Sequence, residues 1–92
     1  MPLTEKVSFR TRLQRGNRVQ VPKLVRWRFK MEPDQVLKIG VDAVNVFSGG
    51  QIFYGKMGKD GRILIPKLTL TLLRGKEADL AGYVMDVSIE PA

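Results

Sequence analysis

Residues 18–24 read Arg-Val-Gln-Val-Pro-Lys-Leu, and residues 62–68, 44 positions further on, read Arg-Ile-Leu-Ile-Pro-Lys-Leu. Arginine, proline, lysine and leucine keep their places in both stretches, and apolar residues recur before the proline. Alternation of this kind predicts a short half-buried strand, and proline ends it because proline has no N–H to donate to a sheet ladder. The chain is therefore expected to contain the same strand twice.

The sequence around each copy repeats as well, over residues of about 7–46 and 51–89, which indicates an internal duplication. Each copy is expected to read strand, turn, strand, turn, strand. The turns at residues 14–17 and 58–61 carry Gly-Asn and Asp-Gly pairs, which favour hairpins, and Gly16 and Asn17 are both able to adopt positive φ. The third strands, at residues 35–44 and 80–89, each show one apolar face, formed by Leu37, Ile39, Val41 and Ala43 in the first and by Ala81, Tyr83, Met85 and Val87 in the second.

The stretch after each proline differs between the copies. Residues 23–31 fit a short helix with proline at its start, although their later part also alternates like a strand. In the second copy, Thr69-Leu70-Thr71-Leu72 favours strand over helix, because β-branched residues are enriched in strands.

These patterns predict one all-β domain over residues 1–92, with only small helical turns. A chain of 92 residues holds one small core. Three strands alone cannot cover an apolar face, whereas two copies interleaved about a pseudo-twofold axis can close a barrel and remove the exposed edges. We therefore expect a six-stranded closed barrel made of two βββ repeats. Because both copies lie in one chain, a monomer is favoured over an obligate dimer.

Composition excludes several classes of site. The chain has no cysteine and no histidine, so it contains no thiol nucleophile, no imidazole base and none of the commonest metal ligands. No apolar run reaches the ~20 residues that a membrane-spanning helix needs, and residues 1–6 lack the apolar core of a signal peptide. The sequence predicts a cytoplasmic protein with no membrane association, no cofactor, no metal and no catalytic residues.

Positive charge is concentrated in the first half of the chain. The net charge is +7, and residues 1–46 carry ten basic and four acidic groups against six and five in residues 47–92. Such asymmetry points to a polyanionic partner, and arginine suits phosphate because its planar fork binds two oxygens at once. Lys30 belongs to the same basic cluster, and the expected nucleic-acid-binding residues are Arg10, Arg12, Arg15, Arg18, Lys23, Arg26 and Arg28. The alternative is a basic surface that serves only solubility.

Three aromatic residues accompany these cations. Trp27, Phe29 and Tyr54 would stack on bases if they were exposed. For Trp27 and Phe29 the sequence favours a place in the core.

The order of strand, turn, strand ending in an apolar-Pro-Lys unit, short helix and strand resembles the AbrB family of transcription regulators. The residues that carry the resemblance are 16–23 and 60–67. AbrB-like proteins have one such unit per chain and dimerise into a swapped-hairpin barrel. The tandem arrangement is similar to duplicated archaeal members of the cradle-loop barrel group, in which one chain forms a RIFT-type barrel of the kind found in riboflavin synthase. The resemblance implies that basic residues near the hairpin and helix face DNA.

The sequence is also compatible with functions other than DNA binding. The second copy has Tyr54, Leu70 and Leu72 where the first has Arg10, Arg26 and Arg28, so DNA binding would use one copy only. Related archaeal barrels include riboflavin kinases, which makes a nucleotide- or flavin-binding barrel the alternative, followed by an interaction module without a ligand. Four aspartates suit a divalent cation but are scattered and fit turns and strand ends better: Asp34, Asp42, Asp79 and Asp86.

Overall fold

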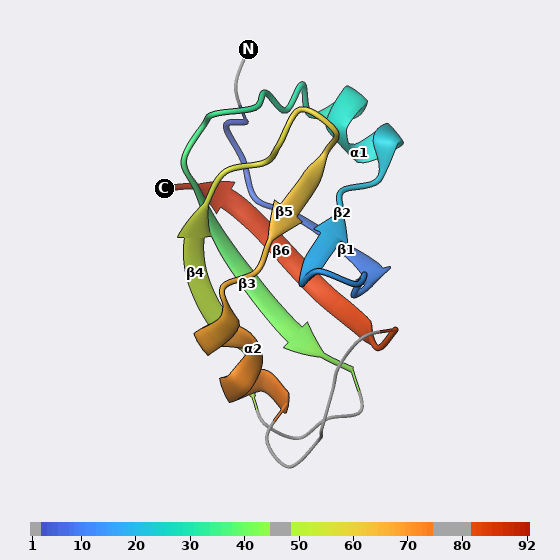
Figure 1. Cartoon of the computed structure of the whole chain (residues 1–92). Helices are drawn as coiled ribbons and strands as arrows, with labels where there is room; N and C mark the ends of the chain where they lie inside the picture. The colour runs from blue at the N-terminus through green and yellow to red at the C-terminus, as the bar shows by residue number, and fades with distance from the viewer. Residues whose placement is uncertain (1–2, 45–48, 75–81) are drawn as a thin grey trace.

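The computed structural model describes residues 3–44, 49–74 and 82–92. Its elements follow one another as strand, strand, helix, strand in each half of the chain (Figure 1). The first half contains β1 (Val7–Arg12), β2 (Arg18–Gln20), α1 (Lys23–Arg28) and β3 (Leu37–Ala43). The second half contains β4 (Gln51–Gly55), β5 (Arg62–Leu64), α2 (Lys67–Arg74) and β6 (Val84–Pro91).

The six strands form two antiparallel sheets. One has four strands in the order β1-β6-β3-β4, and the other is a ribbon of β2 and β5 that lies across one face of it (Figure 1). Two pairs of strands in corresponding positions of the two halves pair with each other: β2 with β5, where Val19 lies opposite Ile63, and β3 with β6, where Val41 lies opposite Val87. The corresponding strands β1 and β4 lie at opposite edges of the larger sheet. Each strand pairing in the two sheets thus joins one half of the chain to the other, which is the interleaving that the sequence predicts.

The expected closed barrel is wrong. In the described residues, β1 pairs with β6 and β2 with β5, and one isolated bridge between Gln14 and Arg18 is the link between β1 and β2. β2 and β5 have three residues each, about 10 Å of strand, which is too short to pair with neighbours on both sides along a closed ladder. The hairpins predicted around residues 14–17 and 58–61 are present only as tight turns, because the short strands that follow them pair with each other and not with the preceding strands.

The expected strand at residues 69–72 is also wrong, because these residues belong to α2. Thr69 and Leu73 are buried, and Leu70 packs against the core. Residues four apart lie on the same face of a helix, so this spacing gives α2 one inward face. Packing of that face outweighs the preference of threonine for strands.

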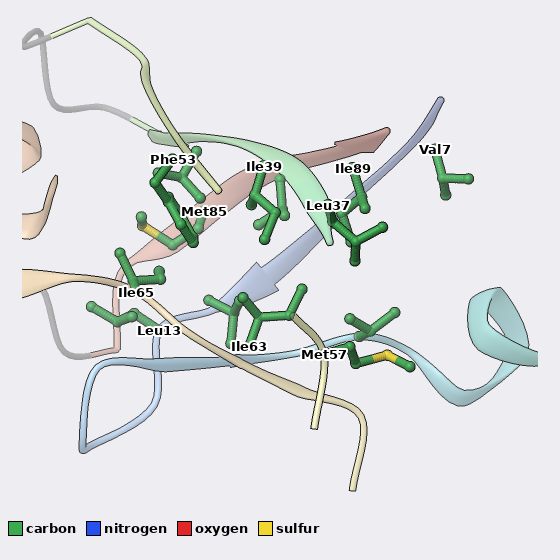
Figure 2. Close-up of a cluster of buried hydrophobic side chains, with 14 of the residues drawn as sticks. Val7, Leu13, Leu37, Ile39, Phe53, Met57, Ile63, Ile65, Met85 and Ile89 are labelled. Carbon is green, nitrogen blue, oxygen red and sulfur yellow. The ribbon is translucent and has the colours of Figure 1, made fainter. Parts of the chain in front are cut away.

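The core lies between the ribbon and the larger sheet (Figure 2). The predicted inward face of β3 is confirmed, since Leu37, Ile39, Val41 and Ala43 are all buried. In β6, Met85 and Val87 are buried as expected, while Ala81 lies outside the described residues. Val19 and Ile63 face these strands from the ribbon, and both side chains are fully buried.

Each turn closes onto the other half of the molecule. The carbonyl of Gly61 accepts a hydrogen bond from the Val21 N–H (2.9 Å), and the carbonyl of Asn17 accepts one from the Ile65 N–H (2.8 Å). Val21 and Ile65 directly precede the prolines at which α1 and α2 begin. Each helix therefore starts beside a turn of the opposite half. Within the described residues, no helix has the length and apolar character needed to cross a membrane.

Candidate functional site

The seven basic residues selected from the sequence lie on three separate surfaces. Arg10 and Arg12 are exposed on β1, whose inward positions Val7 and Phe9 pack on the core, so both arginines lie on the outer face of the larger sheet. Arg10 Nε lies 2.6 Å from Asp86 Oδ1, and Arg12 donates a hydrogen bond to the carbonyl of Gly82 (2.9 Å). Both side chains therefore already have partners within the fold.

Arg15 and Arg18 belong to the second surface, which includes the outer side of the ribbon. Arg15 is exposed in the turn before β2, where Gly16 and Asn17 adopt φ values of 81° and 61°. The expectation that both residues take positive φ is confirmed. Arg18 is exposed opposite Leu64. The ribbon and the larger sheet share one core, so Arg18 points away from Arg10 and Arg12.

The third surface is α1, which holds Lys23, Arg26 and Arg28. At about 100° per residue, Lys23, Leu24, Trp27 and Arg28 fall on one side of this helix, and all four are exposed. Val25, on the opposite side, packs against the core. We call the outward side, with Lys30 just beyond it, the α1 surface: Lys23, Leu24, Trp27, Arg28 and Lys30.

Arg26 is directed inward, toward the turn that precedes β5. A Cβ built on Gly61 would lie 2.5 Å from Arg26 Cζ, which shows that the guanidinium packs directly on this glycine. Arg26 Nε is buried and has no hydrogen-bond partner in the described residues. Arg26 therefore attaches α1 to the second half of the molecule and is less accessible to a ligand than Arg28.

The expectation that Trp27 belongs to the core is wrong. Its side chain is 79% exposed, and that of Leu24 is 75% exposed. Phe29, by contrast, packs against the core as expected. Leu24, Trp27, Arg28 and Lys30 line a hollow of about 530 Å³. A large aromatic side chain is thus held in solvent in a hollow that two cations also line.

Lys30 is placed in this hollow by an unusual helix end. Its φ is 51°, its N–H bonds the carbonyl of Trp27 (3.3 Å), and the N–H of Met31 bonds the carbonyl of Arg26 (3.0 Å). These two bonds form a Schellman motif, in which the left-handed position is usually glycine because side chains are strained there. The chain has lysine at this position, which adds a cation beside Trp27.

The α1 surface is positively charged, and the acidic residue nearest to it in the chain is Glu32. Residues 18–31 contain no acidic residue. Within the described part of the chain, the observed ion pairs involve Arg10, Lys38 and Arg62, and none involves Lys23, Arg28 or Lys30. Cations near the C-terminal end of a helix also favour its dipole, which accounts for part of the placement of Arg28. Lys23 lies at the opposite end, where a cation is unfavourable.

A second concave surface lies on the outer face of the larger sheet, where Arg10 is located. It has a volume of about 620 Å³, and its floor consists of small residues in register on three strands, namely Ser8, Ser88 and Gly40. Asp42 and Asp86 lie opposite each other along one side. Two carboxylates beside one arginine repel phosphate, so this groove is poorly suited to a nucleotide.

The described residues contain no group of three or more acidic side chains that could hold a metal ion. Asp34 lies in a turn, as expected, with φ 73°. Asp42 and Asp86 line the groove on the larger sheet, and Asp79 lies outside the described residues. Nothing in this arrangement indicates an enzymatic activity.

Sequence reasoning missed Leu24 and undervalued Lys30. A usable signal was present: positions 23, 24, 27 and 28 lie on one side of a helix, and two of them are charged. That side cannot be buried without removing both charges from water. A helix over residues 23–28 therefore implies that Leu24 and Trp27 are exposed.

No protein-family model and no curated protein matches the chain. Among solved structures, it is similar to the solution structure of PHS018 from Pyrococcus horikoshii, with a TM-score of 0.72 and 22% sequence identity. The match covers 99% of this chain and 94% of that one. At this level of identity the likeness concerns the fold alone.

Proposed function

We propose that the protein binds nucleic acid weakly and with little sequence preference through its α1 surface. The observation that carries the proposal is the group of exposed cations Lys23, Arg28 and Lys30, which have no ion pair in the described residues. Phosphate contacts by such cations supply most of the affinity in non-specific binding, with Kd of roughly 10⁻⁴–10⁻⁶ M at physiological salt. Arg15 and Arg18 lie on a different surface and are assigned no role.

The proposal includes a cytoplasmic location and a monomer, in which one α1 surface meets the nucleic acid. It also retains kinship with AbrB-like proteins, which the two apolar-Pro-Lys units support. A nucleotide- or flavin-binding site is less well supported, because the groove on the larger sheet brings Asp42 and Asp86 together.

Neutralising the α1 surface is expected to weaken binding more than an equal loss of charge elsewhere. The double variant Arg28→Gln/Lys30→Gln loses two phosphate contacts, and the double variant Arg10→Gln/Arg12→Gln loses the same charge on the outer face of the larger sheet. Fluorescence anisotropy with a labelled mixed-sequence oligonucleotide, at salt concentrations from about 50 to 200 mM, measures both. The α1 variant is expected to lose roughly ten- to a hundredfold in affinity at the lowest salt.

The salt dependence adds a second readout. Three contacts give a slope of log K against log salt of about −2 to −3, and each removed contact lowers its magnitude by about one. Equal losses in the two variants would show that only net charge matters. Absence of binding by the unmodified protein at low salt would overturn the proposal.

Lys30→Gly is expected to stabilise the fold while weakening binding. Glycine removes the strain of a side chain at φ 51°, which exceeds the entropy cost of glycine in the unfolded chain, for a net gain of about 0.5–1 kcal/mol. The same change removes one cation from the α1 surface. Chemical denaturation and anisotropy measure the two effects separately. A variant that is more stable and binds as tightly as the original would show that Lys30 takes no part in binding.

A further inference from the structure

We infer that the α1 surface selects single-stranded nucleic acid, with an unpaired base stacked on Trp27. This inference rests on the proposed function and adds the class of nucleic acid. The observation behind it is the hollow of about 530 Å³ that Leu24, Trp27, Arg28 and Lys30 line. Cations bind the phosphates of a duplex as well as those of a single strand, so any preference for the single strand must come from the aromatic side chain.

Trp27 is exposed because of its position on the helix. Val25 and Phe29 occupy the inward side of α1 and pack on the core, so a side chain at position 27 points outward. The indole thus presents a large apolar surface to solvent. Solvent contact with such a surface is unfavourable, and a flat partner that covers it gains both hydrophobic and stacking energy.

The surroundings of Trp27 define the chemistry of that partner. Arg28 Cζ lies 5.7 Å from the centroid of the Phe29 ring, which holds the guanidinium beside the helix. Lys30 lines the same hollow as Trp27 and Arg28. A partner that fits has a flat, apolar group for Trp27 and anionic groups within reach of both cations. A nucleotide in a single strand carries both a base and phosphates.

A duplex fits less well, because its bases are stacked inside and only phosphates and groove edges reach a protein surface.

The second half of the molecule has no equivalent of this site, since Thr71 and Leu72 stand where the first half has Trp27 and Arg28. A second copy of the chain is disfavoured, because it brings its own charge of +7 to a cationic surface. A membrane surface would meet only two apolar side chains on a six-residue helix.

Trp27 is the one tryptophan of the chain, so its fluorescence reports contact at this position directly. The experiment titrates the protein with an oligothymidylate of about 12 nucleotides, with a duplex of the same length and with anionic phosphatidylserine vesicles. We expect the single strand to quench the emission and to bind at least about fivefold more tightly than the duplex. Anisotropy of the labelled oligonucleotides gives the affinities independently of the tryptophan.

The variant Trp27→Ala is expected to lose roughly 5- to 150-fold in affinity for the single strand, which corresponds to the stacking of one base, and less than about twofold for the duplex. Trp27→Phe retains an aromatic face and is expected to keep most of the affinity, whereas Trp27→Leu keeps only an apolar group and is expected to lose it. Tyr54→Ala is the matched control, because Tyr54 is another exposed aromatic residue (63%) but lies on β4. Far-UV circular dichroism confirms that each variant is folded.

The outcomes separate this inference from the proposed function. Equal affinity for both oligonucleotides, with Trp27→Ala unchanged, would overturn single-strand selection while nucleic-acid binding stands. Loss of affinity in Tyr54→Ala as large as in Trp27→Ala would overturn stacking at this position. No binding to either oligonucleotide would overturn both. A blue shift of the emission with vesicles, without an effect of oligonucleotides, would assign the surface to lipid.

Discussion

Ile63→Ala is expected to lower the free energy of unfolding by about 2–5 kcal/mol. Ile63 is 0% exposed at the centre of β5, opposite Val19, and Figure 2 shows it between the ribbon and the larger sheet. The ribbon contributes three residues from each strand, and within each strand the central residue faces the core. Removal of three methyl or methylene groups from this position leaves a cavity that so short a ribbon cannot close by shifting.

The matched control for this variant is Leu64→Ala. Leu64 is the next residue of the same strand, is 60% exposed and has nearly the same volume. Its replacement is expected to change stability by less than about 0.5 kcal/mol. Urea unfolding followed by far-UV circular dichroism measures both, because the exposed Trp27 is a poor reporter of core packing. Similar losses in the two variants would contradict the assignment of Ile63 to the core.

Small domains of this kind have about 5–15 kcal/mol of stability in total. A loss of the expected size therefore lowers the melting temperature by roughly 10–40 °C. If Ile63→Ala does not fold at all, Ile63→Val, expected to cost about 0.5–1.5 kcal/mol, tests the same position.

The inward faces of the strands were predictable from the sequence because the period of a strand is local. Leu37, Ile39 and Val41 alternate with polar residues or glycine, and a two-residue period sends them to one side of a sheet. Turn composition likewise identified Gly16 and Asn17 as residues able to adopt positive φ. Both properties depend on neighbours in the chain.

The choice of partner strand was not predictable in this way. Alternation shows that residues 7–13 form a strand but not that this strand pairs with β6, about 76 residues away, in place of β2. A hairpin was the natural expectation because its loop is short. The structure differs because Val19 and Ile63, side by side on the β2–β5 ribbon, bury their side chains together against the larger sheet, which gains more than β1 and β2 would gain as an isolated pair.

The accessibility of the basic side chains was likewise not predictable from local sequence. Arg10, Arg12 and Arg28 are similar in sequence context, yet the first two are occupied by Asp86 and by the Gly82 carbonyl, both in the last 11 residues of the chain. Whether an arginine is available to a ligand depends on such distant partners. The exposure of Trp27 depended only on the helical phase of α1 and was within reach of the sequence.

Gly61→Ala is expected to be more costly than any other change of one methyl group in the turns. The φ of Gly61 is 81°, so alanine pays about 1–2 kcal/mol for the left-handed conformation. The new Cβ would also lie 2.5 Å from Arg26 Cζ and 2.6 Å from Arg26 Nε. The guanidinium is the far end of a flexible side chain and can swing outward, which costs about 1 kcal/mol of lost packing. The expected total is about 2–3 kcal/mol.

Two further variants separate these contributions. Gly16 has the same φ of 81°, but a Cβ there meets nothing within 4 Å, so Gly16→Ala carries the conformational cost alone. Gly61→Ala in an Arg26→Ala background has no guanidinium to displace and is expected to cost no more than Gly16→Ala, as measured by urea unfolding. If Gly61→Ala costs the same with and without Arg26, the side chain does not pack on the turn. A coupling of about 1 kcal/mol would instead show that Arg26 fastens α1 to the second half of the molecule, which is the attachment that keeps Trp27 and its flanking cations facing solvent.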